Sequence, residues 1–503
     1  MRTRRLCALG LTAAASVVLA SCGSSAPADV STPTANRAAI PIAGAGATGA
    51  RLLDWPEFGL DAQRSDVSEA ATAIDAANLG RLRHVSVALP GTVDSSPIYL
   101  HDVAAGGATR NLIVATSSYG RTVAIDADSA RIVWTFTPAG IARWAGGPQI
   151  TTTSPIADPD RSFVYAASPD GLIHKLALSD GRESAGWPVS VTRDATHEKL
   201  AAALNIAGGA VIATTGGYLG DAPPYQGHVV LISRSSGRVV RIFNTLCSNR
   251  RELLVPSSCQ ASDSAILARG GAVVEPGATR MLIATGNAPW NGSTDFGDSV
   301  LELSLPDLRL LQSFTPADQA QLNSSDSDLG SSAPALLGHE RTVIAGKDGI
   351  MRVLALPRLD GHPPSGARVH PLGGEVQRLS IPGGGQLFTA PAVWQHRGRT
   401  TVFVGAEGGT GAYVLRAGRL YLAWQNSNPG TSPVMAGGLL YVYDPVAGGI
   451  FVYRPSSPRP LAKLAGSRGH WNSPIVVDGH VIEPEGNAND HRSSGALEIF
   501  SAP

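Results

Sequence analysis

Ser95-Ser96-Pro97-Ile98 begins the clearest structural unit of this 503-residue sequence. The same pattern of small or polar residues, proline and an apolar residue returns five more times. The copies are Thr153-Ser154-Pro155-Ile156, Ser332-Ala333-Pro334-Ala335, Thr389-Ala390-Pro391-Ala392, Thr431-Ser432-Pro433-Val434 and Asn472-Ser473-Pro474-Ile475. Two glycine-rich segments, Gly208-Gly209-Ala210-Val211 and Gly270-Gly271-Ala272-Val273, fill the gaps in the series. The sequence therefore has eight unit starts, spaced by about 40 to 60 residues, which is the period of propeller blades.

Each start is followed by further short apolar strands and tight turns. In the first unit, residues 111–115 and 122–125 are two such strands, and the turn at residues 126–130 leads to Arg131-Ile132-Val133-Trp134. β-Branched strands with small turn residues and little helical periodicity indicate all-β structure. A four-stranded sheet buries both faces only by stacking around an axis. We expect one eight-bladed β-propeller of four-stranded antiparallel sheets, with Trp134 covering the joint between neighbouring sheets.

The segment before the first start is predicted to close this ring. Residues 83–89 read Arg-His-Val-Ser-Val-Ala-Leu, a strand pattern that has no partner in the first unit. Pairing with the last blade would join the two ends of the chain and leave no free edge at that joint.

The N-terminus has the pattern of an export signal. A basic start at residues 1–5 precedes an apolar run at residues 6–20, too short for a permanent membrane helix. Leu19-Ala20-Ser21-Cys22 resembles a bacterial lipobox, in which cleavage leaves Cys22 as the lipidated N-terminus. The alternative is an ordinary cleaved signal with an incidental cysteine. We expect an exported lipoprotein, held at the extracytoplasmic side of a bacterial membrane through Cys22.

Composition divides the rest of the chain. Residues 1–21 are the predicted signal, and residues 22–50 are rich in Ala, Ser, Pro, Gly and Thr, which is typical of a flexible tether. Residues 51–503 are the predicted propeller. The 40 basic and 40 acidic residues balance and form no charged blocks, so the electrostatic footprint of a nucleic-acid-binding protein is absent.

Two cysteines remain after Cys7 leaves with the signal and Cys22 takes lipid. In an oxidising compartment, Cys247 and Cys259 are expected to form a disulfide. The alternative, a metal-binding pair, lacks neighbouring histidine or cysteine ligands.

Three polar turns indicate where a functional site would lie. They are Ala284-Thr285-Gly286-Asn287-Ala288-Pro289-Trp290-Asn291, Asp326-Ser327-Asp328-Leu329-Gly330 and Gly346-Lys347-Asp348-Gly349. With the tryptophan-docking pattern ending at Trp134, they resemble the quinoprotein alcohol dehydrogenases, propellers that hold pyrroloquinoline quinone (PQQ) and calcium over their axis. The resemblance extends from about Leu53 to Pro503.

The resemblance implies a role for each polar residue. Asn287 stands at the family's calcium-ligand position beside the cofactor, and Lys347 at that of a basic residue on the quinone oxygens. Asp328 is the expected general base, which would take the alcohol proton, and Asp326 a second catalytic or calcium-binding carboxylate. From the residues alone, Asn287 and Lys347 are equally consistent with ordinary turns, and the two aspartates with a solvated acidic loop.

Three departures from the family argue against this chemistry. Tyr218 stands where the family has a carboxylate calcium ligand, and Asp221 lies three residues further on. Residues 266–269 (Ile-Leu-Ala-Arg) contain no tryptophan to form the floor under the quinone. The adjacent cysteine pair that covers the quinone in many members is also missing. Loss of a carboxylate ligand weakens calcium binding, and loss of a stacking ring costs about 1 kcal/mol.

Two functions therefore remain. The first is a non-catalytic binding or scaffold propeller with a degenerate quinoprotein site, similar to envelope-assembly lipoproteins built on the same repeat and with an envelope protein as its partner. The alternative is a PQQ- and calcium-dependent dehydrogenase that oxidises a small-molecule alcohol or sugar. The fold alone does not choose between them.

Overall fold

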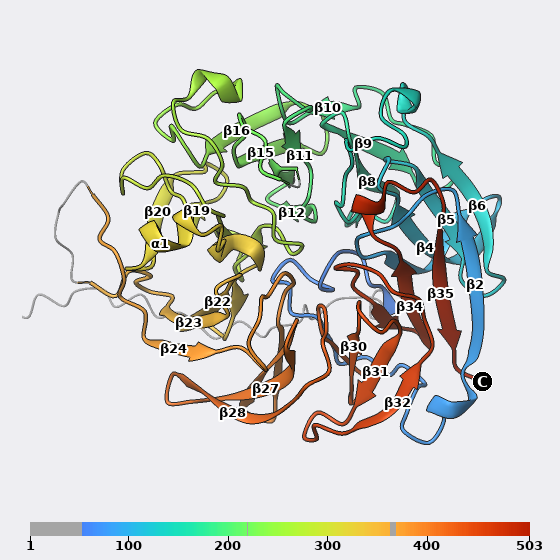
Figure 1. The fold of residues 1–503 in the computed structure, drawn as a ribbon. Helices are drawn as coiled ribbons and strands as arrows, with labels where there is room; N and C mark the ends of the chain where they lie inside the picture. The colour runs from blue at the N-terminus through green and yellow to red at the C-terminus, as the bar shows by residue number, and fades with distance from the viewer. Residues whose placement is uncertain (1–52, 219, 363–368) are drawn as a thin grey trace, which may run out of the picture. The chain divides into compact units, whose positions relative to one another are not determined.

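In the computed structural model, residues 53–218, 220–362 and 369–503 are described. Their strands form eight antiparallel blade sheets that follow one another around a ring in chain order (Figure 1). Within these ranges the single α-helix is α1 (Gln319–Ser324). The predicted all-β, eight-bladed propeller is confirmed.

Each blade runs from an innermost strand at the axis to an outermost strand at the perimeter. Blade 1 has β3 (Ile98–Ala105), β4 (Ala108–Thr116), β5 (Thr122–Asp126) and β6 (Arg131–Phe136). Blade 2 has β7 (Ile156–Ala157), β8 (Phe163–Ser168), β9 (Leu172–Ala177) and β10 (Val189–Ser190). Blade 3 has β12 (Asn205–Ala207), β13 (Ala210–Thr214), β15 (His228–Ser233) and β16 (Val239–Asn244). Blade 4 has β17 (Val273–Val274), β18 (Arg280–Ala284), β19 (Val300–Ser304) and β20 (Leu310–Phe314).

The second half of the ring repeats this order. Blade 5 has β21 (Ala335–Leu336), β22 (Arg341–Ala345), β23 (Ile350–Ala355) and β24 (Gln377–Ser380). Blade 6 has β25 (Ala392–His396), β26 (Arg399–Ala406), β27 (Gly409–Arg416) and β28 (Arg419–Asn426). Blade 7 has β29 (Val434–Ala436), β30 (Leu439–Tyr443), β31 (Ile450–Tyr453) and β32 (Pro460–Leu464), with β1 (Val67–Ser68) added beside β29. Blade 8 has β33 (Ile475–Val477), β34 (His480–Glu485), β35 (Gly495–Ser501) and β2 (Arg83–Leu89). A small separate ladder pairs β11 (Glu198–Lys199) with β14 (Gly216–Gly217).

Blade 8 closes the ring as predicted. Strand β2 pairs antiparallel with β35 along its whole length, from Arg83 opposite Ser501 to Leu89 opposite Gly495. The strand that immediately precedes blade 1 in the chain thus completes blade 8, so backbone hydrogen bonds join the two ends of the propeller.

Seven of the eight predicted starts lead directly into an innermost strand, and one is corrected. Gly208 and Gly209 form the tight turn between β12 and β13, where both residues have positive φ angles (53° and 82°). The innermost strand of blade 3 begins earlier, at Asn205. The misassignment has a physical cause, since a Gly-Gly turn and a glycine-rich start are both followed by an apolar strand.

The segment before β2 fills the axis of the ring, which the sequence did not indicate. Residues 54–68, called here the axial strap, form backbone hydrogen bonds to innermost strands of five blades. The partners are Trp55 with Tyr99, Pro56 with Ala157, Ala62 with Val274, Ser65 with Val393 and Asp66 with Met435. Figure 1 shows the start of the described chain, in blue, at the middle of the ring. The strap therefore bonds to strand edges that face the axis.

Two tryptophans on outermost strands cover joints between blades. Trp134 of β6 is buried and its indole N–H donates to Leu178 O of blade 2 (2.8 Å), as expected for the docking pattern. Trp424 of β28 repeats this contact towards blade 7, donating to Pro455 O (2.8 Å). Each ring adds buried apolar surface at a joint that strand pairing does not cover.

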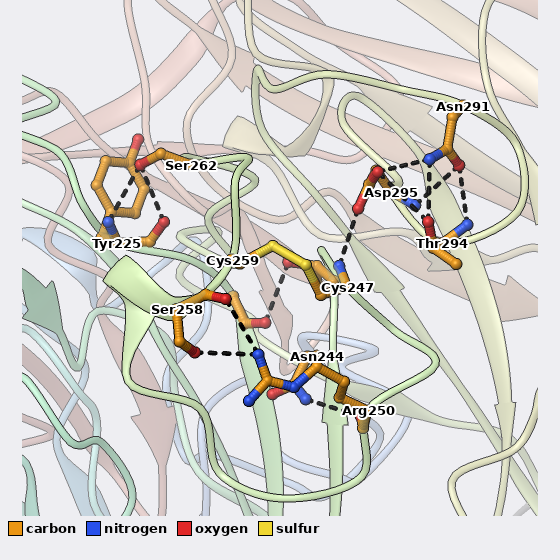
Figure 2. Close-up of a disulfide and its surroundings, with 12 residues drawn as sticks. Tyr225, Asn244, Cys247, Arg250, Ser258, Cys259, Ser262, Asn291, Thr294 and Asp295 are labelled. Carbon is orange, nitrogen blue, oxygen red and sulfur yellow. Dashed lines mark hydrogen bonds between the residues drawn. A yellow bond between two sulfur atoms is a disulfide. The ribbon is translucent and has the colours of Figure 1, made fainter.

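The predicted disulfide is present between Cys247 and Cys259 (Figure 2). It closes the loop that joins blade 3 to blade 4. Inside the loop, Arg250 Nη1 donates to the carbonyl and hydroxyl oxygens of Ser258 (both 3.1 Å), and Asn244 Nδ2 donates to Arg250 O (2.9 Å). The loop is therefore held at several points on both sides of the cross-link.

Replacing both cysteines by serine is expected to lower the free energy of unfolding by about 3 kcal/mol. The disulfide restricts the unfolded chain to a short closed loop, and removing it restores that loop entropy. Urea denaturation of the purified protein measures the loss. Reductant should destabilise the wild type by a similar amount and leave the serine variant unchanged; an effect of reductant on the variant would assign the loss to something else.

No helix in the part of the chain that the structure describes is long and apolar enough to cross a membrane. The signal at residues 1–21, the tether at residues 22–50 and the lipid site at Cys22 lie outside the described residues.

Candidate functional site

One end of the propeller collects the residues that precede innermost strands. Because strands in a blade are antiparallel, the start of the first strand and the turn between the second and third lie at the same end. We call this end the mouth. Asp94, Arg269 and Asp328 precede innermost strands, and Asn287 and Lys347 lie in turns between second and third strands. The residues predicted for a quinoprotein site therefore lie at the same end of the ring.

Asn287, Asp328 and Lys347 come into direct contact. The backbone N–H of Asn287 donates to Asp328 Oδ1 (2.6 Å), and Lys347 Nζ lies 2.7 Å from Asp328 Oδ2. A Cβ atom on Gly286 would collide with this carboxylate, so the glycine allows the close approach. The predicted convergence of these turns is observed, although the contact of Asn287 is through its backbone N–H.

The aspartates of this cluster differ in environment. The Asp328 side chain is only 2% exposed, and burial raises the pKa of its carboxyl against the opposing pull of Lys347. Asp326 is 59% exposed and lies 3.0 Å from the same ammonium. Lys347 thus contacts two carboxylates, and the pKa of its ammonium is raised because the pull of Asp328 and Asp326 outweighs the effect of burial.

A third aspartate belongs to this cluster and was not predicted. Asp298 is fully buried; it accepts a hydrogen bond from the Leu329 N–H (3.1 Å) and a long one from Gln319 Nε2 (3.4 Å). Burial, with repulsion from Asp328, raises the pKa of Asp298 to about 8. Asp298 lies in a turn with many other polar residues, so the sequence did not indicate that its side chain is buried.

Tyr218, at the family's carboxylate position, does not reach this cluster. Its hydroxyl donates to the Ala195 carbonyl (3.0 Å), and its ring packs against buried residues that include Tyr119 and Trp144. Asp221 accepts a hydrogen bond from the Tyr225 hydroxyl (2.9 Å). Neither residue replaces the missing carboxylate ligand beside Asn287.

A buried ion pair crosses the mouth between blades 1 and 4. Arg269 Nη2 lies 2.8 Å from Asp94 Oδ1, and the two side chains are 4% and 0% exposed. Asp94 Oδ2 also accepts from the Ala488 N–H (3.0 Å) and lies 2.7 Å from His470 Nδ1. Burial alone would raise the pKa of Asp94, but Arg269, His470 and the Ala488 N–H hold it well below its usual range. The pair was not predicted.

Aromatic rings and a second cation surround this pair. The Arg269 guanidinium lies 5.4 Å from the ring centre of Trp471, which stacks with His470 and Phe388 at 3.9 and 4.2 Å. Burial, together with repulsion from Arg269, lowers the pKa of Lys199 to about 8. Beside the rings, Phe388 and Trp471 line a mostly apolar pocket of about 360 Å³. The mouth therefore presents aromatic surface over a buried layer that contains the Arg269–Asp94 ion pair and Lys199.

These residues do not fit calcium. Both oxygens of Asp328 already have donors, and Lys347 holds Asp326 as well. Among the described residues, the only three Asp, Glu, His or Cys side chains with ligand atoms within 4.8 Å of one another are Cys247, Cys259 and Asp295. Two of these three are joined in the disulfide. Calcium needs several oxygen ligands, including carboxylates, and the mouth does not present that set.

The quinone also lacks its expected support. Where the resemblance calls for an aromatic floor shortly before Gly270, the chain places Arg269, tied to Asp94 and to Thr152 O (3.2 Å). The guanidinium is held from two sides, so it cannot turn aside without breaking its buried ion pair with Asp94. The mouth brings together the three polar residues that the resemblance names, but it offers neither an aromatic floor at the expected place nor a set of ligands for calcium.

The comparisons with known proteins agree with this fold. A family model described as outer membrane protein assembly factor BamB matches residues 71–273. Quinohemoprotein alcohol dehydrogenase from Comamonas testosteroni has a similar structure, with a TM-score of 0.65 and 15% identity over 90% of this chain and 81% of that one. A europium-containing methanol dehydrogenase is also similar, with a TM-score of 0.64 and 14% identity over 90% of this chain and 98% of that one. BamB from Moraxella catarrhalis has a TM-score of 0.51 and 12% identity over 84% of this chain and 97% of that one.

No curated protein sequence matches this chain. At identities of 12 to 15%, the structural matches show a shared fold and leave the function to the residues of the mouth.

Proposed function

We propose that this PQQ-like β-propeller is an exported, membrane-anchored protein that binds another component of the envelope and does not oxidise a substrate. The observation that carries the proposal is the ion pair of Arg269 with Asp94, which fills the place of the quinone floor with a fixed charge. The match to a family model named for outer membrane protein assembly supports the same function. Anchoring through Cys22 rests on the lipobox pattern in the sequence.

Addition of PQQ and calcium to the purified full-length protein is expected to give no saturable change in quinone absorbance and no dye reduction with alcohols or sugars. Arg269 stands where the quinone floor is expected, and the carboxylates of Asp326 and Asp328 are already paired with Lys347. Absorbance titration, with the melting temperature as a second readout, measures binding. An apo-quinoprotein dehydrogenase loaded in parallel shows that the reagents are competent.

The second candidate is a PQQ- and calcium-dependent dehydrogenase, and one observation favours it: Asn287, Asp328 and Lys347 do converge. In that case the quinone would bind in stoichiometric amount, and dye reduction would be lost in Asp328→Ala. The matched control is Asp180→Ala, an exposed aspartate in the outer hairpin of blade 2. Saturable quinone binding together with this pattern of variants would replace the proposal above.

A further inference from the structure

A groove of about 520 Å³ lies at the perimeter, between the outer edges of blades 3 and 4. One wall is the outermost strand β16, which contributes Val239, Val240 and Arg241. The other is formed by the turn between β19 and β20, with Asp307 and Arg309. Arg251, from the disulfide-closed loop, completes the lining. The turn between β19 and β20 lies at the end of blade 4 opposite the mouth, because the strands of a blade are antiparallel.

Positive charge is concentrated around this turn. Arg251 Nη1 donates to Leu308 O (2.9 Å), and Arg241 Nη2 lies 3.9 Å from Asp307 Oδ1. Arg309 follows directly, and within the described ranges its guanidinium has no hydrogen bond or ion pair. The groove is therefore lined by three arginines and a single carboxylate, Asp307, in a protein whose total charge is balanced. The local excess attracts an acidic ligand.

The wall of the groove is also a free strand edge. In the described part of blade 3, β16 pairs with β15 on one side only. Val239 and Val240 are 37% and 41% exposed. An open edge with apolar side chains accepts a further strand, since the backbone N–H and C=O groups on it are available for a ladder. Arg241 Nη1, which donates to Val240 O (2.7 Å), covers one of these acceptors in the free protein.

We propose that this groove binds an acidic segment of a partner protein in extended conformation, which pairs with β16 and sets its carboxylates against Arg241, Arg251 and Arg309. A protein segment is favoured over a lipid headgroup because only a backbone can pair with the open edge. The disulfide-closed loop holds Arg251 in place before binding, which reduces the entropy cost of association. The proposal goes beyond the function proposed for the mouth and does not depend on it.

Fluorescence anisotropy with a fluorescein-labelled peptide of alternating glutamate and valine tests this binding on the purified full-length protein. The double variant Arg241→Gln/Arg309→Gln is expected to bind about tenfold more weakly, since two charge contacts are lost. Arg416→Gln/Arg419→Gln is the matched control, with the same charge change on the outer hairpin of blade 6, and should bind like the wild type. A peptide with lysine in place of glutamate should not bind.

Strand pairing has its own test. N-methylation of alternate amides in the same peptide removes donors and keeps every charge, so it should abolish binding. Equal binding of the methylated peptide, or equal binding by the double variant, would overturn the proposal. A third outcome would also overturn the proposal: the wild type does not bind the peptide but captures vesicles of phosphatidylglycerol, and the double variant does not capture them. The arginines would then bind a lipid surface.

Discussion

Arg64→Ala is expected to lower the free energy of unfolding by about 3–5 kcal/mol. Arg64 belongs to the axial strap and is 1% exposed. Its guanidinium donates to Gly270 O (2.9 Å), Leu204 O (2.7 Å) and Phe58 O (2.7 Å), and it pairs with Glu57 at 2.7 Å. The alanine variant leaves the Glu57 carboxyl group, which is 14% exposed, without its partner and three carbonyls without this donor, and each such loss is costly.

Urea denaturation followed by tryptophan fluorescence measures this effect. Arg64→Lys keeps the charge but not the planar fork of donors, and should fall between the wild type and the alanine variant. Arg182→Ala is the control, because that side chain is 87% exposed and its loss should cost less than about 0.5 kcal/mol. A wild-type midpoint for Arg64→Ala would mean that the strap does not hold the blades together.

The fold was predictable because its signals are local. Proline and glycine punctuation, short apolar strands and the position of residues 83–89 are all read within single units of the sequence, and ring closure follows from the need to pair the last edge. The one misplaced start, at Gly208, came from a turn that resembles a start over four residues. The axial strap was missed because its contacts are distant: Arg64 reaches Gly270, 206 residues away.

In the candidate site, too, some contacts could be predicted from the sequence and others could not. The convergence of Asn287, Asp328 and Lys347 follows once eight blades surround an axis, since each turn then has a known end of the ring. The pair of Arg269 with Asp94 joins residues 175 positions apart, and nothing in either local sequence names the partner. One signal was available: each of the two charges directly precedes an innermost strand, a place where most blades have small or apolar residues.

Two buried arginines cross-link the blades near the axis on the same principle. Arg64 of the strap joins the carbonyls of Leu204 and Gly270, which precede the innermost strands of blades 3 and 4, and Arg269 joins Asp94 of blade 1 to blade 4. Three innermost strands, β7, β17 and β21, have only two residues each, so few backbone hydrogen bonds hold the centre of the ring in those blades. Buried guanidinium groups, each with several donors, supply cross-links between blades that the sheets cannot make.

Asp94→Ala is the corresponding change at the mouth, and it is expected to cost about 3–5 kcal/mol of unfolding free energy, because Arg269 would remain buried without its counter-ion. Asp94→Asn should lose a similar amount at neutral pH, since it removes the charge but not the volume. Replacing both partners, as Asp94→Ala/Arg269→Met, should cost less than Asp94→Ala alone, because no buried charge then remains. Denaturant midpoints of the three variants and the wild type measure these differences.

The pH dependence gives an independent check on the same ion pair. Because the folded-state pKa of Asp94 lies well below its unfolded value of about 3.9, the carboxylate stabilises the fold above that pH. The contribution is lost as the pH falls through the lowered folded-state pKa. The stability difference between the wild type and Asp94→Asn should therefore be constant near neutral pH and shrink on acidification below about pH 4. A difference that stays constant into strong acid would show that the loss in Asp94→Asn comes from packing, and the ion pair with Arg269 would then carry no net stability.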